Sequence, residues 1–405
     1  SKTVMKYQQY AEYKDSGVQW IGEIPQTWSF LRGKWKFRSL KEVNRNLQCM
    51  ERLALTLNGV IERSIDSDEG LQPAEFSGYQ IFEKNDLVFK LIDLENFKTS
   101  RVGLVFKRGI MSPAYIRLQP FKDTDSKFFY YFYFDLYLRG IYNQIGGQGV
   151  RSALNATDLL EIEVCVPTVS EQRKIANFLD HETAKIDSLI EKQQQLIQLL
   201  KEKRQAVISH AVTKGLNPNV MMKDSGVEWL GQVPEHWGIV KLKWKAVTTS
   251  GSTPTTSKYE LYYENGDIPW IRTTDLNNGD LYETPIYITS RAVNDSACSV
   301  LPVNSILIAM YGGAGSIGKH SLLKFESTIN QAVCGVLPSK FFEPNYLHRF
   351  YEFYRPFWMI GASGTRKDPN IGQDHIKEAL VPIPQLEEQI QIAQHISEIQ
   401  TKFDA

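Results

Sequence analysis

Apolar residues follow a helical spacing over one long segment in the middle of the chain, from Thr168 to about Val212. They recur in steps of three and four residues, which is typical of a helix packed lengthwise on another helix. Thr168 and Glu171 have the spacing of a capping box, and Gly215 and Pro218 supply end signals. About 45 residues would span roughly 65 Å, more than one small domain covers, so a partner helix is expected. The apolar seam consists of Ile175, Leu179, Ile186, Ile190, Ile197, Leu200, Val207 and Ala211.

Short apolar runs separated by turns predict β-rich domains on both sides of this helix. Each side also holds one aromatic stretch, 128–138 and 345–357, which is predicted to be helical. We interpret these rings as core packing, with base stacking as the alternative. The pattern therefore predicts an α+β fold. Its expected strands are 79–82, 87–92 and 102–106 before the helix, and 268–271, 286–288 and 306–309 after it.

The chain contains an internal repeat with two copies. Residues 14–28 and 223–237 are identical at nine of fifteen positions, and each is followed by a basic and aromatic segment, 32–36 and 241–245. At the far end of each copy, a strand ending in Pro leads into Glu-Gln, at 164–172 and at 381–389. We call these repeated segments the frame. A shared frame around two divergent inserts suggests one task performed on two different targets.

The repeat predicts four parts: an N-terminal domain 1–167, a long helix 168–214, a C-terminal domain 215–384 and a second helix 385–405. The second helix is shorter than the first, and the sequence leaves open whether this is natural or the result of a cut. We hypothesise that a longer natural protein, or self-association with a second copy, completes the helix pair.

The composition argues against a global attraction to polyanions, because 46 basic residues balance 46 acidic ones. A nucleic-acid role must then rest on local patches or on a more basic partner. Four cysteines without a CxxC pair suit a reducing compartment. No apolar run reaches about 18 residues, so the expectation is a soluble cytoplasmic protein without a membrane contact.

Catalytic motifs are weak. The segment 313–319 imitates phosphate-binding loops, but His320 stands where a P-loop needs Ser or Thr, and the residues that follow look like a strand. The seven histidines have no metal-ligand spacing, and the Asn-Pro-Pro-aromatic motif of adenine methyltransferases is missing. The sequence predicts no metal site, no bound cofactor and no catalysis by this chain.

Candidate DNA contacts come from three places, and for each the alternative is an ordinary solvated face or turn. Between Lys84 and Arg117, seven basic residues stand against three acidic ones. The loop Gly-x-Arg-x-x-x-Asn occurs in both copies, at 149–155 and 364–370, and polar residues suited to base edges gather in the second domain. The candidates are Lys90, Lys98, Arg101, Lys107, Arg108, Arg151, Asn155, Arg272, Thr273, Asn277, Tyr311, Lys319, Arg366 and Asn370.

Three features together resemble the specificity subunit of Type I restriction-modification systems. They are the two Lys-Asp-Ser-Gly-Val signatures, the run Pro-x-Pro-x-x-Glu-Glu-Gln at 382–389 and the long central helix. The resemblance covers almost the whole chain.

The resemblance implies two target recognition domains, each reading one half of a bipartite double-stranded DNA site, with two antiparallel helices as a coiled-coil spacer. It also implies that the frame docks two methylation subunits, which bind S-adenosylmethionine and methylate adenine. Restriction subunits with ATP and magnesium are an additional implied partner. The residues expected at the docking surface are Trp20, Trp28, Trp229, Trp237, Glu171, Gln172, Glu388 and Gln389.

Two other classes of function remain open at this point. A protein-binding adaptor would explain the neutral charge and the repeat, but neither the basic span nor the repeated Arg loops. A fused methyltransferase or nuclease is disfavoured by the missing motifs.

Overall fold

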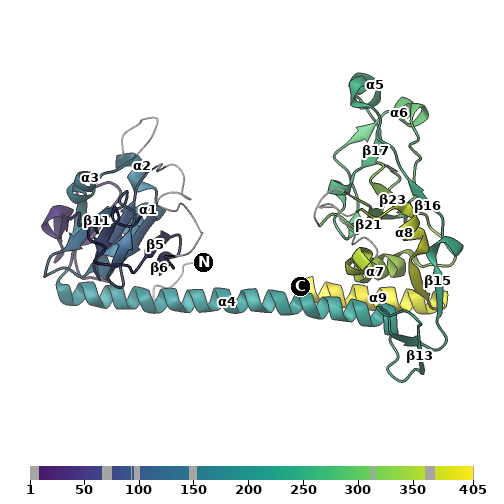
Figure 1. The fold of residues 1–405 in the computed structure, drawn as a ribbon, viewed down its shortest axis with the longest axis horizontal. Coiled ribbons are helices and arrows are strands. Elements are labelled where there is room, and N and C mark those ends of the chain that lie inside the picture. Colours follow the sequence, from purple (N-terminus) through teal and green to yellow (C-terminus); the bar gives the residue numbers. More distant parts are fainter. Residues whose placement is uncertain are drawn as a thin grey trace. The chain divides into compact units, whose positions relative to one another are not determined.

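The computed structural model describes residues 9–65, 75–92, 94, 101–145, 153–311, 315–360 and 370–404. The chain divides into two compact units, Ser1–Ile190 (unit 1) and Glu191–Ala405 (unit 2). The division falls inside the long helix α4 (Val169–Lys214), so each unit includes one part of this helix (Figure 1).

Unit 1 is built on a four-stranded antiparallel sheet in the order β4-β11-β8-β9. Side chains alternate between the two faces of this sheet along each strand. Both faces are buried, because each packs against its own hydrophobic core. Leu87 and Phe89 of β8 pack against the aromatic helix α1, whereas Val88 packs against the β5–β6 hairpin. The elements are β4 (Phe37–Ser39), β5 (Leu53–Thr56), β6 (Gly59–Glu62), β7 (Gln80–Phe82), β8 (Leu87–Lys90), β9 (Arg101–Leu104), β10 (Gly109–Met111), β11 (Ile116–Pro120), α1 (Ser126–Leu138) and α2 (Ile141–Ile145).

Unit 2 contains a five-stranded mixed sheet in the order β16-β23-β20-β21-β18. Along β20, Ile306 and Ile308 face the aromatic helix α7, and Leu307 and Ala309 face a second core. The elements are β16 (Thr248–Ser250), η3 (Thr256–Lys258), α5 (Tyr259–Tyr262), β17 (Ile268–Ile271), η4 (Thr273–Asp275), β18 (Asp280–Leu281), β19 (Tyr287–Ile288), α6 (Ser290–Asp295), β20 (Ile306–Ala309), β21 (His320–Leu323), β22 (Thr328–Ile329), β23 (Val333–Val336), α7 (Pro344–Tyr354) and η5 (Arg355–Ile360).

The repeated frame folds alike in the two units. In each unit the signature forms a β-hairpin, and the next strand pairs antiparallel with the strand that precedes the long helix. The first copy consists of β1 (Tyr13–Asp15), β2 (Glu23–Pro25), β3 (Ser29–Arg32), η1 (Gly33–Trp35), α3 (Ala156–Glu161) and β12 (Glu163–Val166). The second consists of β13 (Met222–Asp224), β14 (Gln232–Pro234), β15 (Gly238–Lys241), η2 (Leu242–Trp244), α8 (Gln373–Glu378) and β24 (Leu380–Ile383).

The predicted elements are confirmed. All six expected runs contain a strand, and both aromatic stretches contain a helix, although α7 ends at Tyr354 and is followed by η5. The core interpretation of the aromatic stretches also holds for their largest buried rings, such as Phe129, Tyr133, Phe350 and Tyr351. The α+β architecture with an internal repeat is therefore as the sequence predicts.

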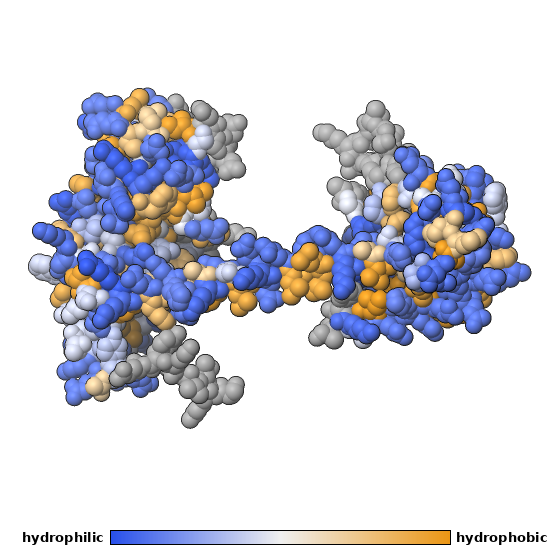
Figure 2. Space-filling model, turned by 90° about the horizontal axis from the view of Figure 1, so that it is seen from below, coloured by the Kyte–Doolittle hydropathy of each residue, from blue (hydrophilic) through white to orange (hydrophobic). Residues whose placement is uncertain are grey.

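The long helix is covered only at its ends within the described chain. Ala176 packs into the core of unit 1. In unit 2, Ile208 and Val212 share a core with the second helix, α9 (Leu386–Asp404), which runs back along α4 (Figure 1). Apolar side chains between these ends are exposed, as Figure 2 shows along the bare stretch of helix. They are Ile186, Leu189, Ile190, Leu196, Ile197 and Leu199.

Candidate nucleic-acid interface

The two ends of the frame meet at the first turn of a long helix in each unit. The Trp28 indole donates to Glu171 Oε1 at 3.1 Å, and the Trp237 indole donates to Glu388 Oε1 at the same distance. Each carboxylate also interacts favourably with the positive end of its helix. Four of the residues expected at the docking surface therefore bond to one another inside their own unit.

The glutamines that follow also serve a structural role. Gln172 accepts a hydrogen bond from the Asp125 amide and donates to the Pro167 carbonyl. Gln389 accepts from the Glu343 amide and donates to the carbonyls of Phe341 and Pro384. Asp125 and Glu343 are the N-caps of α1 and α7, so each glutamine joins an aromatic helix to a long helix. Both glutamines are buried, which explains their repetition, and their contact with a partner stays a prediction.

The two remaining docking candidates are half-buried. Trp229 packs against the rings of Tyr354 and Phe357, at centroid distances of 4.8 and 5.3 Å. Trp20 lies 6.4 Å from Phe132 and accepts a bond from Arg139 at its carbonyl. Both indoles keep an exposed edge, so part of each remains accessible to another molecule.

Two side chains of the basic span between Lys84 and Arg117 pair with acidic residues from elsewhere in the chain. Lys107 Nζ lies 2.9 Å from carboxylate oxygens of both Glu51 and Glu62, and Arg108 pairs with Glu83 at 3.3 Å. These acids lie outside the span, so counting charges along it overestimated the positive surface. Both side chains keep an exposed part, so their contact with DNA stays a prediction.

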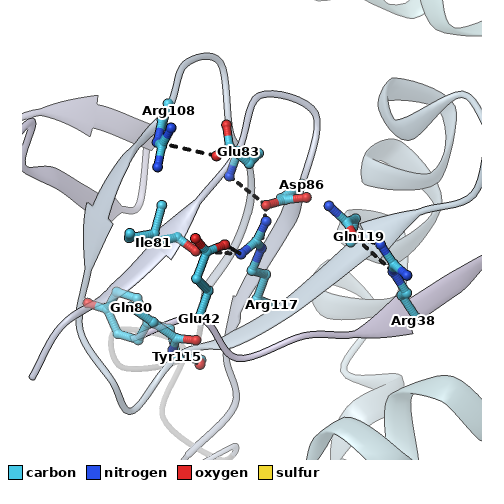
Figure 3. Close-up of polar contacts among 10 residues, drawn as sticks. All are labelled: Arg38, Glu42, Gln80, Ile81, Glu83, Asp86, Arg108, Tyr115, Arg117 and Gln119. Carbon is cyan, nitrogen blue, oxygen red and sulfur yellow. Dashed lines mark hydrogen bonds and ion pairs between the residues drawn. The ribbon is translucent and has the colours of Figure 1, made fainter. Parts of the chain in front are cut away.

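Arg117 is a core residue and not a surface one. Its guanidinium is fully buried, with Nε 2.5 Å from Asp86 Oδ2 and Nη1 2.6 Å from the Ile81 carbonyl. Glu42 lies at the edge of the same network (Figure 3). A buried pair of this kind costs desolvation that only close geometry and further hydrogen bonds offset. Arg117 is therefore unavailable to DNA.

The other candidates of unit 1 differ in accessibility. Lys90 is half-buried at the end of β8, and Lys98, the side chain of Arg101 and Arg151 lie outside the described residues. Asn155 caps α3, because its side-chain oxygen accepts from the amides of Thr157 and Asp158 at 2.8 and 3.1 Å. A cap is a sufficient reason for Asn at this place.

Unit 2 gathers several of its candidates near η4 and the sheet edge. Arg272 binds the Asp275 carboxylate with two nitrogens, at 3.2 and 3.1 Å, and Thr273 begins η4. Asn277 donates to the Asp280 carbonyl and accepts from the Gly279 amide, so its amide shapes a turn. Tyr311 and Lys319 are half-buried, Asn370 is exposed, and Arg366 lies outside the described residues.

The glycine-rich segment behaves as a turn over its described part. Residues 312–314 lie outside the described chain, and 315–318 form a turn that leads into β21. Gly318 has φ +69°, and a Cβ there would collide with Trp358. Glycine is thus required both by the backbone conformation and by close packing.

The sequence prediction missed an aromatic hollow of about 540 Å³ beside Arg272. Tyr259 and Tyr263 stack on its wall, with ring centroids 5.3 Å apart, and Trp270 lies 6.0 Å from Tyr263. Flat rings beside a guanidinium suit contacts with bases. The i, i+4 spacing of Tyr259 and Tyr263 was the available signal, but their meeting with Arg272 depends on the fold.

Two other features are absent from the described residues. No group of three or more His, Cys, Asp and Glu side chains there could hold a metal ion. Within the same residues, every helix is too short or too polar to cross a membrane.

Comparisons with known proteins agree with this architecture. The family model described as Type I restriction modification DNA specificity domain matches residues 33–199 and 234–405. The chain is 31% identical over 176 residues to the Type I restriction enzyme MjaIX specificity subunit of Methanocaldococcus jannaschii, covering 42% of this chain and 39% of that protein. It is 24% identical over 307 residues to the EcoBI specificity subunit of Escherichia coli, covering 72% of this chain and 62% of that protein.

A solved structure from work on complex assembly and conformational transition of the type I R-M system has the same fold. Its TM-score is 0.67 at 15% identity, and the match covers 94% of this chain and 92% of that one. The matches to the two curated relatives each span less than two thirds of the relative's length. With the family domain present twice on a repeated frame, this chain belongs to the family of Type I restriction-modification DNA specificity subunits.

Proposed function

We propose that each unit binds one half of a bipartite DNA sequence and that α4 and α9 set the distance between the halves. One observation carries the proposal: a repeated frame holds two inserts whose sheets differ in strand number and order. A repeated scaffold with divergent faces suits a protein that reads two different half-sites. Each base pair between the two half-sites moves the second half-site along the DNA axis and rotates it around that axis. A rigid helical spacer suits this requirement, because it holds the two units at a fixed separation.

The chain supplies recognition without catalysis in this proposal. Two methylation subunits dock on the frame, bind S-adenosylmethionine and methylate adenine, and restriction subunits add ATP- and magnesium-dependent steps. The complex acts on DNA in the cytoplasm. Candidates for DNA contact that are at least partly exposed include Lys90, Arg108, Tyr311, Lys319 and Asn370, together with the aromatic hollow beside Arg272.

Mapping methylated adenines tests the proposal directly. The chain is co-expressed with the methylation subunit encoded beside it, and modified adenines are located across the host genome. The expected result is a bipartite motif with one methylated adenine on each strand. As a matched control, exchange of residues 246–371 for the corresponding insert of a relative should change one half of the motif and leave the other half unchanged.

A protein-binding adaptor predicts a different result with purified components. DNA recognition gives duplex affinity that falls steeply as salt rises, because phosphate contacts release counterions. An adaptor shows no such affinity, and no methylation motif is obtained. Absence of both signals in a complex of verified composition would contradict the proposal.

The exposed stretch of α4 remains expected to pair with another helix, from a longer protein or from a second copy. Six apolar side chains between Ile186 and Leu199 have no cover in unit 1 or unit 2. Light scattering of the chain, with hydrogen exchange across 186–199, separates self-association from a stable monomer. A strict monomer with full protection in this stretch would contradict the expectation.

A further inference from the structure

Arg272 directly follows β17, and its guanidinium is fixed on one side. The Nε and Nη2 atoms donate to the two carboxylate oxygens of Asp275, at 3.2 and 3.1 Å. A guanidinium carries five N–H donors in a planar fork, so this pair uses two of them and leaves three. Among the residues that the structure describes, Nη1 has no partner, and 39% of the Arg272 side chain is exposed. The outward side of the fork is therefore left for another molecule.

Asp275 holds the guanidinium in a set orientation. Its side chain is only 8% exposed, and its carboxylate also accepts from the backbone amide of Arg272 at 2.8 Å. Main chain and side chain of Arg272 are thus bound to the same carboxylate. The pair is formally neutral, so it attracts a distant phosphate weakly, because the carboxylate cancels the positive charge. Its outward donors still suit an uncharged acceptor such as the edge of a base.

The aromatic hollow next to this guanidinium has walls that are held by hydrogen bonds. The Trp270 indole donates to the Ser252 carbonyl at 3.0 Å, and the Tyr263 hydroxyl donates to the Pro254 carbonyl at 2.6 Å. Tyr259 stacks on Tyr263 with 14° between the ring planes. Such rings restrict the water that reaches the guanidinium from this side. A donor left without an acceptor there is poorly compensated, so the site should reject a wrong partner strongly.

The strand pairing brings a second polar side chain to the same edge. Strands β17 and β22 run parallel, with Ile271 opposite Ile329, so their carboxyl ends lie side by side. Arg272 follows one end, and the exposed Gln331 follows the other. Thr253, which lines the hollow, donates a hydrogen bond to Gln331. Arginine and glutamine are the side chains suited to purine edges, so this edge has the composition of a base-reading surface.

We propose that Arg272 is a specificity-determining residue of unit 2 and reads one guanine of its half-site. Nη1 and Nη2 donate to O6 and N7 on the major-groove edge of that base, where the two acceptors distinguish guanine from the other bases. Asp275 is a positioning residue, because it fixes the guanidinium without touching the base. The proposal rests on the function proposed above and names both the base that is read and the residue that reads it.

Base analogues in duplex DNA test this with the full chain in complex with the methylation subunit. The exchange of residues 246–371 identifies the half-site that unit 2 reads, and that half-site should contain a required G·C pair. Replacing its guanine with the 7-deaza analogue, which lacks N7, should lower the affinity about tenfold. Adenine, which carries an amino group in place of O6, should lower it further. Inosine lacks only the minor-groove amino group and should leave the affinity unchanged.

Variants assign the effect to the guanidinium. Arg272→Ala should abolish the preference for guanine at that pair and leave every other position of both half-sites as selective as in the wild type. Arg272→Lys keeps the charge without the planar fork and should retain only part of the preference. Asp275→Asn should lower the ratio of affinities for guanine and its 7-deaza analogue. Arg291→Ala is the matched control, because Arg291 pairs with Asp295 in the same unit, is 65% exposed and does not line the hollow.

The possible failures are distinguishable. If the wild-type complex shows neither a methylation motif nor salt-dependent duplex affinity, the proposed function itself fails. If a motif is found but the half-site of unit 2 requires no G·C pair, or if Arg272→Ala keeps full selectivity, the assignment of Arg272 is overturned. Equal weakening for all sequences, with a smaller dependence on salt, would make Arg272 a phosphate contact and would also overturn the assignment.

Discussion

The two units share a repeated frame, but the cores of their inserts bury different polar groups. Unit 1 buries an ion pair, Arg117 with Asp86, whereas unit 2 buries two histidine rings, His320 and His348, with centroids 4.8 Å apart. Burial lowers the pKa of His320 to about 3 and the pKa of His348 well below its usual value, so both rings are neutral at physiological pH. The frame around these cores repeats the same contacts in both units, from the Trp–Glu hydrogen bond to the buried glutamine. The difference shows that the frame places few demands on the insert, which is then free to diverge in its surface.

The charged core of unit 1 should respond most strongly to mutation. Asp86→Ala removes the closest and, among the described residues, only buried carboxylate beside the Arg117 guanidinium, because Glu42 is partly exposed and lies farther away. The change is expected to cost about 3–5 kcal/mol of unfolding free energy. Urea unfolding, monitored by hydrogen exchange of peptides from each unit, measures this loss of stability, and unit 2 is the internal reference.

Two variants sharpen that result. Glu83→Ala removes the partner of Arg108 on the surface, so its cost should stay below about 1 kcal/mol. Replacing both Asp86 and Arg117 with Leu and Met should recover most of the stability, because neither charge then remains buried. Equal stability of Asp86→Ala and wild type would show that the ion pair does not form.

Equivalent mutations in the two copies of the frame should lower the stability of their units by equal amounts. Gln172→Ala and Gln389→Ala each leave buried backbone groups without their partner, at an expected cost of about 1–3 kcal/mol per unit. Gln193→Ala on the exposed face of α4 is the control and should be close to neutral. A large loss in one unit with none in the other would break the equivalence of the two copies.

Lowering the pH should destabilise unit 2 more than unit 1, and this difference should be smaller than the effects of the core mutations. The folded pKa of His320 lies below its unfolded value near 6.5, so the stability of unit 2 is complete above pH 6.5 and decreases as the pH falls towards 3. Between pH 7 and 5.5, His320 alone should cost about 1 kcal/mol. Unit 1 contains one histidine, His181, which is exposed, and should change less. His320→Leu should flatten the pH dependence of unit 2, and an unaltered slope would contradict the assignment.

The candidate DNA contacts were less predictable than the fold. Lys107 and Arg108 belong to a basic run in sequence, but Glu51 and Glu62, at the β5–β6 hairpin, and Glu83, directly after β7, pair with them. Arg117 was counted with that run and is a core residue. Asn155, chosen because its loop recurs, is accounted for by the cap of α3.

What the amino-acid sequence alone determined was the repeat, the long helix, the positions of the strands and the aromatic cores. These depend on periodicity, capping and turn residues, which act over a few neighbouring positions. The tertiary structure alone decided which repeated residues remain exposed. Trp28 and Trp35 are both tryptophans of the frame, but only Trp28 meets a carboxylate, contributed by a residue 143 positions away. Exposure and charge pairing depend on such distant partners, so they follow from the packed fold and not from the local pattern.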